Sequence, residues 1–285
     1  RCSSRSWGVA SHTVRRRYVT TPTGQVHLRE LGAAVGRPLL CLHKTPSSSV
    51  QFLRVAPLLA AAGYRVLALD TPGFGSSDPL PGGPTIGGFA RSVVAVLDAL
   101  GLDAVDVVAH HTGSLTAVEL AARHSARVRS IVLGGVLVMQ DAAERDSYKP
   151  YLTRYSFELD SRGAFLAKYP REVLNDWLTR DDPEQYLWES VAYLQGARTF
   201  TDTYLCTLEH DAWELLPQLR LPVLFLDQEE GRCHESTVRV APRVPGAEYV
   251  CLPGTSEGCL DDPEPFAAEV LRFLAAQATR AGAAG

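Results

Sequence analysis

One short stretch, residues 105–119 (VDVVAHHTGSLTAVE), limits the folds open to this chain more than any other. It joins an apolar run that ends at His110 to an amphipathic run that begins at Gly113. So sharp a turn from strand to helix requires small residues where the two elements nearly touch, and Ala109 and Gly113 supply them. We therefore expect His111 to project from the tip of the turn, at the positive end of the following helix.

Elements of the same two kinds repeat along the chain. A β-rich pair at 17–20 and 25–31, joined by Pro-Thr-Gly, is typical of an opening hairpin. Short strand-like runs, several of them apolar throughout, then alternate with segments of helical spacing, which predicts a mostly parallel, eight-stranded sheet with helices on both faces. The strand runs are 39–42, 64–69, 105–110, 128–133, 223–226 and 249–252, and the helical runs are 50–62, 86–100, 113–123 and 265–276.

The alternation stops between residues 139 and 217. This segment is charged and rich in Tyr and Trp, and its pattern contains no convincing strand. We predict a helical lid at 139–217, inserted between two parts of one core at 17–138 and 218–278. The Arg- and Ser-rich start at 1–16 and the Ala/Gly-rich end at 279–285 are expected to be flexible tails.

Composition narrows the setting and the partners. The formal net charge is -4, so the chain lacks the basic bias of a nucleic-acid-binding protein. No apolar run approaches the roughly 18 residues that a membrane span needs, and the six cysteines are scattered without CxxC spacing. We therefore predict a cytoplasmic bacterial protein, monomeric or homodimeric, that acts on a small molecule and has neither a nucleic-acid nor a membrane partner.

The order of elements and several motifs resemble the α/β-hydrolase fold. The segment 42–46 (LHKTP) is similar to the HGxP segment of that family, 70–77 (DTPGFGSS) to its DxPGxGxS loop, and 222–226 (PVLFL) to its penultimate strand. The turn at His111 resembles the nucleophile elbow, in which the family has Ser, Asp or Cys. The resemblance covers residues 17–276 and implies an enzyme with a catalytic triad.

The triad itself is altered. Hydrolysis in this family requires a nucleophile, a histidine that accepts its proton, and a carboxylate that orients the histidine. Here His111 takes the first position, Gly231 stands where the carboxylate is expected, and Glu257 or Ser256 stands where the histidine is expected. The nearby Asp227, Glu229 or Glu230 could replace the carboxylate only if the loop were reshaped. The serine-hydrolase mechanism is therefore not available to this chain.

Two parts of the machinery are expected to remain. The backbone N–H groups of Thr45 and Thr112 depend on loop shape rather than side chains and should form an oxyanion hole. An imidazole with an ordinary pKa of about 6.5 is a suitable general acid/base at neutral pH, and Glu257 or Ser256 would orient His111. Such a site is suited to cyclisation, elimination, isomerisation or C–C cleavage. We predict that the substrate is a small or mid-sized carbonyl metabolite, aromatic or polyketide-like. The reaction would belong to bacterial secondary or catabolic metabolism.

Further side chains are predicted to line the substrate pocket. For His43, however, a hydrogen bond that braces its own loop is the favoured interpretation, and most lid aromatics should pack on the core. No metal cluster, P-loop or GxGxxG helix is evident, so we predict no metal and no cofactor. The predicted pocket residues are His43, Lys44, Ser47, Ser48, Tyr148, Trp177, Trp188 and His234.

Two other functions stay open. His111 could activate water, which would make the protein a hydrolase. Alternatively, the protein could bind a ligand without converting it, since loss of all three triad residues is also typical of non-catalytic members of this fold. A titratable ring at the tip of the turn favours a catalytic role over ligand binding alone, because random sequence drift would more often leave Ala, Gly or Ser there.

Overall fold

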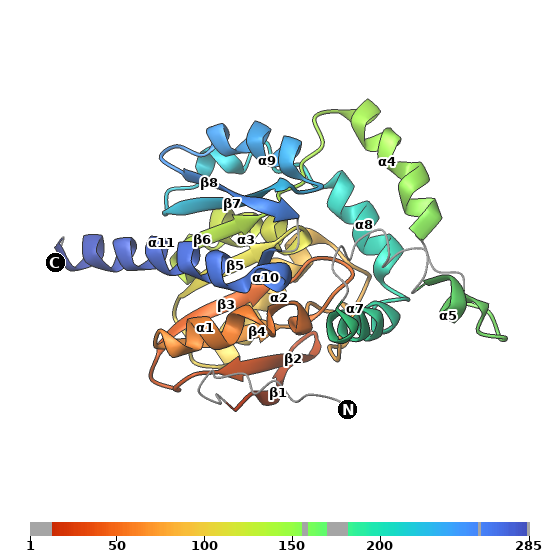
Figure 1. The fold of residues 1–285 in the computed structure, drawn as a ribbon, viewed down its shortest axis with the longest axis horizontal. Helices are drawn as coiled ribbons and strands as arrows, with labels where there is room; N and C mark the ends of the chain where they lie inside the picture. The colour runs from red at the N-terminus through yellow and green to blue at the C-terminus, as the bar shows by residue number, and fades with distance from the viewer. Residues whose placement is uncertain (1–12, 156–158, 170–181, 256–257, 284–285) are drawn as a thin grey trace.

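The computed structural model describes residues 13–155, 159–169, 182–255 and 258–283. Its eight strands form one sheet in the order β1-β2-β4-β3-β5-β6-β7-β8 (Figure 1). β1 and β2 form an antiparallel hairpin, β2 also pairs antiparallel with β4, and the other pairs are parallel. The predicted eight-stranded, mostly parallel sheet is confirmed. The strands are β1 Arg15–Thr21, β2 Gly24–Leu31, β3 Arg37–Leu42, β4 Tyr64–Leu69, β5 Val105–His110, β6 Val128–Gly134, β7 Val223–Glu230 and β8 Glu248–Thr255.

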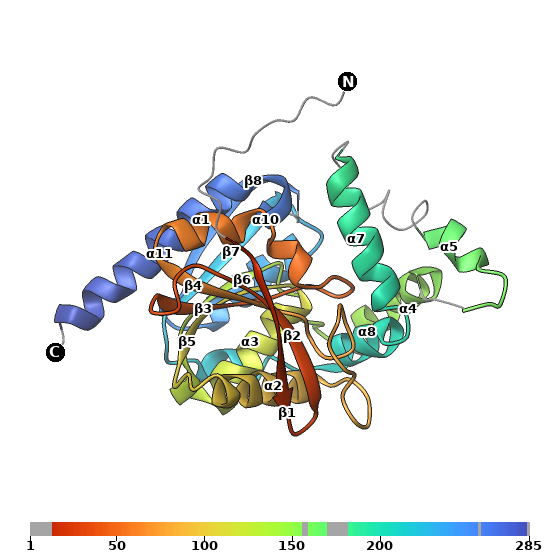
Figure 2. The same ribbon diagram turned by 90° about the horizontal axis from the view of Figure 1, so that it is seen from below.

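Helices cover both faces of the sheet (Figure 2). In β4, Leu67 and Leu69 pack in the apolar cluster under α2, α3 and α9, while Val66 and Ala68 pack in the cluster under α1 and α11. Because both faces are buried, the central strands are mainly apolar rather than alternating between apolar and polar residues. These helices are α1 Val55–Ala61, α2 Ile86–Ala99, α3 Thr112–Arg123, α9 His234–Val240, α10 Gly258–Asp261 and α11 Pro263–Ala283, with short 3-10 helices η1 Ser49–Phe52, η2 Ser125–Arg127, η4 Leu216–Gln218 and η5 Ala241–Arg243.

The segment between β6 and β7 is helical wherever the structure describes it. Its helices are α4 Ala142–Tyr155, α5 Ala164–Tyr169, α7 Pro183–Gln195 and α8 Phe200–Glu209, and none of the described residues in 139–217 belongs to a strand. Tyr193 of α7 and Tyr204 of α8 share an apolar cluster with Leu137 and Cys233, which follow the ends of β6 and β7. The inserted helices therefore pack against the carboxyl ends of the parallel strands.

The two predicted tails are shorter than expected. β1 begins at Arg15, inside the segment 1–16, because Arg15 and Arg16 pair with Glu30 and Arg29 of β2. α11 continues to Ala283, inside the segment 279–285, where alanine-rich sequence favours helix. In the described part of the chain, no helix combines the length and hydropathy that a membrane span requires.

Candidate active site

His111 alone makes the turn from β5 to α3. Its backbone has φ 53° and ψ -115°, and among the described residues it is the one non-glycine residue with positive φ. Such a conformation is strained for a residue with a Cβ. The turn is held by two backbone hydrogen bonds: the His111 N–H donates to Gly134 C=O at 2.8 Å, and the Ser114 N–H donates to His111 C=O at 2.9 Å.

Small residues allow this turn to pack closely against the neighbouring strands. A Cβ at Gly113 would lie 2.2 Å from the carbonyl oxygen of Leu42, at the end of β3. A Cβ at Gly134 would lie 3.0 Å from the ring of His110. The first turn of α3 is therefore pressed against the end of β3, and any larger side chain at Gly113 would separate them.

The imidazole of His111 lines a cavity of about 250 Å³. The ring of Tyr204 lies 6.2 Å from it, centroid to centroid. Tyr148 from α4 lies on the same cavity, and burial raises the pKa of its phenol. The other residues that line the cavity are Leu137, Arg232 and Cys233.

The two predicted oxyanion donors lie on adjacent backbone segments. Thr112 is the first residue of α3, where N–H groups have no partner within the helix. Thr45 lies in the buried segment after β3, which the Gly113 contact brings against the same end of α3. Anions are stabilised at such a helix start by the N–H groups and the helix dipole.

His43 braces its own loop. The Thr71 N–H donates to His43 Nε2 at 2.9 Å, so this nitrogen is an acceptor, and Nδ1 carries the proton that it donates to Lys44 C=O at 2.6 Å. Burial lowers the pKa of this imidazole, which is therefore neutral. With both nitrogens bonded to backbone, His43 fits the bracing interpretation rather than substrate binding.

Lys44, Ser47 and Ser48 are buried, and none of the three is among the residues that line the His111 cavity. Lys44 Nζ lies 3.4 Å from a carboxylate oxygen of Glu189 on α7, and the Ser47 hydroxyl donates to the other oxygen at 2.9 Å. Ser48 caps η1 by accepting a hydrogen bond from the Val50 N–H at 3.4 Å. These residues join the segment after β3 to the inserted helix α7.

The remaining predicted aromatic and triad positions fall elsewhere. Trp188 lines a separate cavity of about 480 Å³ between α1, α7 and the start of α11, and the guanidinium of Arg54 lies 5.6 Å from its ring centroid. Trp177, Ser256 and Glu257 lie outside the described residues.

Near Gly231, the expected position of the triad acid, the structure shows an unanticipated pair, Asp227 and His234. Asp227 is buried within β7, and its carboxylate lies 2.8 Å from Nδ1 of His234, while the Tyr249 hydroxyl donates to the same oxygen at 3.1 Å. Gly231 lies in the loop that follows β7. Asp227 and His234 are seven residues apart, and the turn from β7 into α9 brings them together.

Four residues of the cavity wall were not predicted as site residues: Leu137, Tyr204, Arg232 and Cys233. Arg232 and Cys233 follow the end of β7, and residues after the carboxyl ends of parallel strands commonly form binding sites, so their position was the available signal. His110, by contrast, faces the other side of the sheet, where its Nδ1 accepts a hydrogen bond from the Gln51 amide at 2.8 Å.

Comparisons agree with this architecture. The family model described as alpha/beta hydrolase fold matches residues 37–231, and the chain belongs to this family. A haloalkane dehalogenase from Mycobacterium marinum is 36% identical over 257 residues, which cover 84% of this chain and 85% of the dehalogenase.

Two further similarities are more limited, one in the length of the match and the other in sequence identity. A 2-hydroxy-6-oxononadienedioate/2-hydroxy-6-oxononatrienedioate hydrolase from Dechloromonas aromatica is 34% identical over 114 residues, but the match spans only 39% of either protein. The crystal structure of a haloalkane dehalogenase from Bradyrhizobium elkani superposes with a TM-score of 0.78 at 18% identity, over 94% of this chain and 100% of that one. The latter similarity concerns the fold alone.

Proposed function

We propose that this protein is an enzyme in which His111 acts as a general acid/base on a small or mid-sized carbonyl compound. The observation that carries the proposal is a titratable imidazole at the tip of a strained turn, lining a cavity beside the start of α3. A strained backbone in a folded protein is commonly retained where it positions a functional group.

The proposed reaction moves a proton. The neutral His111 ring takes a proton from the carbon next to a carbonyl, and the resulting enolate oxygen is stabilised by the N–H groups of Thr112 and Thr45. Return of the proton to another atom gives isomerisation, while loss of a leaving group or a carbon fragment gives elimination or C–C cleavage, and attack of the enolate on a second carbonyl gives cyclisation. A covalent acyl-imidazole is disfavoured, because it would need a second base.

The cavity wall supports a particular kind of substrate. Tyr148 and Tyr204 present aromatic surface and hydroxyl groups, and Arg232 is an exposed cation beside them. Such a wall suits an aromatic or conjugated carbonyl compound that carries a carboxylate. The name of the Dechloromonas aromatica hydrolase describes unsaturated oxo-dicarboxylates, which combine these groups.

Water activation by His111 is the second candidate, and the hydrolase names among the relatives favour it. In that mechanism, the imidazole removes a proton from water, and the resulting hydroxide attacks the carbonyl carbon. The two mechanisms differ in whether a C–H bond next to the carbonyl is broken reversibly.

The test is His111→Gln, with His124→Gln as control because His124 ends α3 away from the cavity. Purified protein in D₂O is incubated with a 2-hydroxy-6-oxo-dienoate, and deuterium uptake next to the carbonyl is followed by NMR. We expect uptake in the wild type and the control, and a loss of at least about 100-fold in His111→Gln.

Three other outcomes would count against acid/base chemistry at carbon. Ester or C–C hydrolysis without deuterium uptake that disappears in His111→Gln would favour water activation. Conversion that persists in His111→Gln would assign the chemistry to another group. Binding of the dienoate without any conversion by the wild type would support a non-catalytic binding protein.

A further inference from the structure

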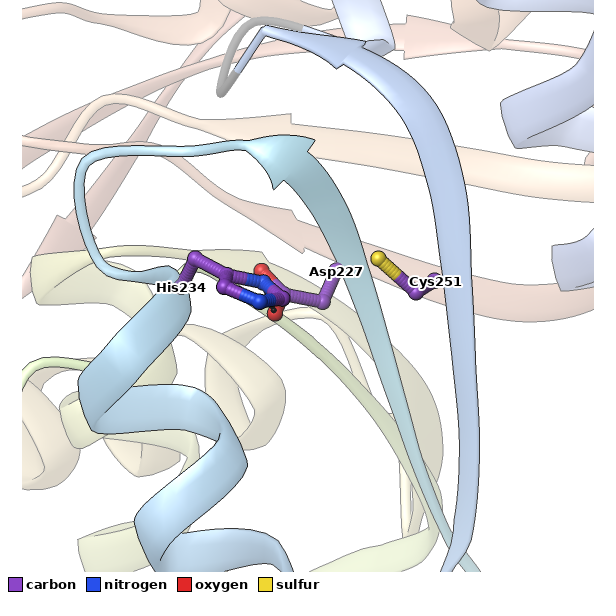
Figure 3. Close-up of side chains that lie close together, drawn as sticks. All are labelled: Asp227, His234 and Cys251. Carbon is purple, nitrogen blue, oxygen red and sulfur yellow. Dashed lines mark hydrogen bonds and ion pairs between the residues drawn. The ribbon is translucent and has the colours of Figure 1, made fainter.

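Three side chains with metal-binding atoms meet beside the edge of the sheet, in the described part of the chain (Figure 3). They are Asp227 of β7, His234 at the start of α9, and Cys251 of β8. One ligand atom from each lies within 4.8 Å of the others. A carboxylate, an imidazole and a thiol so close together form a mixed donor set.

The fold explains how these residues meet. Asp227 and Cys251 are partners in the parallel register of β7 and β8, so their side chains emerge from neighbouring strands on one face of the sheet. Phe225, two residues before Asp227, packs in the apolar cluster on the α9 side, which places Asp227 under α9. The loop after β7 then returns the chain so that the ring of His234 meets the carboxylate (Figure 3).

We propose that Asp227, His234 and Cys251 bind a divalent transition-metal ion, with Zn²⁺ as the best match. Thiolate, imidazole and carboxylate are the three ligand types that zinc sites use, whereas Mg²⁺ and Ca²⁺ prefer oxygen ligands. Three protein ligands leave the fourth tetrahedral position to water. Cys251 is exposed and the His234 side chain is 33% exposed, so water and the ion reach the site from solvent.

The distances need little adjustment. Ligand atoms in a tetrahedral zinc site lie about 3.3–3.8 Å apart, given bonds of about 2.0–2.3 Å to the metal. His234 Nδ1 and the Asp227 carboxylate lie 2.8 Å apart, and no two of the three ligand atoms are more than 4.8 Å apart. Movements of the side-chain atoms by about 1 Å would therefore give the separations of a tetrahedral zinc site. The Tyr249 hydroxyl donates to the Asp227 carboxylate at 3.1 Å and would orient it as an outer-shell partner.

Metal binding at this position would also fix one wall of the His111 cavity. Arg232 and Cys233 immediately precede His234, and both line that cavity. An ion held by β7, β8 and α9 would tie the first turn of α9 to the sheet. The three ligands are separated along the chain and come from three elements, so no metal-binding motif was evident in the sequence and no metal was predicted.

The full chain is tested with Co²⁺ after treatment with EDTA and dialysis. Cobalt bound to a thiolate absorbs in the near ultraviolet by charge transfer, which reports Cys251 directly. We expect one equivalent of Co²⁺ to produce this absorption and Zn²⁺ to abolish it by displacement. Cys251→Ser should remove the absorption, and His234→Gln should weaken Co²⁺ binding at least about 10-fold.

Matched controls are Cys206→Ser on α8 and His124→Gln after α3, which should bind Co²⁺ like the wild type. Zn²⁺ should raise the unfolding temperature of the wild type and of both controls, but not that of His234→Gln. No thiolate absorption in the wild type would overturn the proposal. So would absorption that persists in Cys251→Ser, or binding of several equivalents that neither ligand substitution reduces.

Discussion

At the scale of single residues, the backbone of His111 determines the site. A non-glycine residue in such a sparsely populated conformation costs about 1–3 kcal/mol. The hydrogen bond from the His111 N–H to Gly134 and the packing of Gly113 against β3 hold the turn in place. The imidazole is thus fixed at the cavity by the surrounding fold.

This strain predicts which of two variants at position 111 has the larger free energy of unfolding. His111→Ala removes the imidazole but keeps a Cβ in the strained conformation, whereas His111→Gly removes both. We expect His111→Gly to be more stable than His111→Ala by about 1 kcal/mol in urea unfolding, after allowance for the greater freedom of glycine in the unfolded chain. Equal stability of the two, or a less stable glycine variant, would show that the turn is not strained.

Residue-level prediction from sequence succeeded where the cause is local. The closeness of Ala109 and Gly113 to the tip forces a tight turn, so the position of His111 followed from a few neighbouring residues. The contacts of His43 and Lys44 did not follow from neighbouring residues, because their partners Thr71 and Glu189 approach them only in the folded chain. Nothing in the neighbouring sequence indicates those contacts.

At the scale of elements, the buried carboxylate of Glu189 joins α7 to the segment after β3. It contacts Lys44 at 3.4 Å and accepts a hydrogen bond from Ser47 at 2.9 Å. Removing one partner of a buried ion pair leaves an uncompensated charge and costs about 3–5 kcal/mol, whereas removing both partners often costs much less. The pair therefore specifies where α7 docks.

The Lys44–Glu189 pair predicts that the effects of substituting its two residues on the free energy of unfolding are not additive. Lys44→Met alone should destabilise the protein by about 3 kcal/mol, and the double variant Lys44→Met/Glu189→Gln should recover at least about 1 kcal/mol of that loss. Urea unfolding of wild type, both single variants and the double variant gives the coupling energy. The exposed pair Asp146–Lys149 on α4 is the control, with an expected coupling below about 1 kcal/mol. Equal couplings for the two pairs would contradict this interpretation.

At the scale of the whole molecule, Asp70 connects segments that are far apart in the chain. Its carboxylate bonds to the His27 ring of β2 at 2.8 Å, the Ser49 N–H of η1 at 2.7 Å and the Ser76 N–H of the following loop at 2.9 Å. Burial by itself raises the pKa of Asp70, but these hydrogen bonds outweigh it and lower the pKa from 3.8 to about 2.

The lowered pKa predicts how stability depends on pH. Since the folded state favours ionised Asp70, this contribution is fully present above the unfolded pKa of 3.8 and is lost as the pH falls towards about 2. Asp70→Asn should therefore cost about 2 kcal/mol at pH 7. The difference from the wild type should shrink progressively in urea unfolding between pH 4 and the acid limit of folding. A difference that stays constant over this range would contradict the lowered pKa.

The sheet was predictable across the molecule because burial on both faces makes each central strand a mainly apolar run. The run at 64–69 coincides with β4 and the run at 105–110 with β5. The group formed by Asp227, His234 and Cys251 leaves no such signature. Its members meet only through strand register and the turn of one loop, which a linear pattern does not encode.

The positive φ at His111 has a consequence for divergence. The strain resides in the peptide backbone, so it applies almost equally to every L-amino acid with a Cβ, and only glycine escapes it. Ser, Asp, Cys and His at this tip are therefore nearly equivalent as far as folding is concerned. A substitution among these residues would therefore change the reactive group at the cavity with little change in the backbone strain.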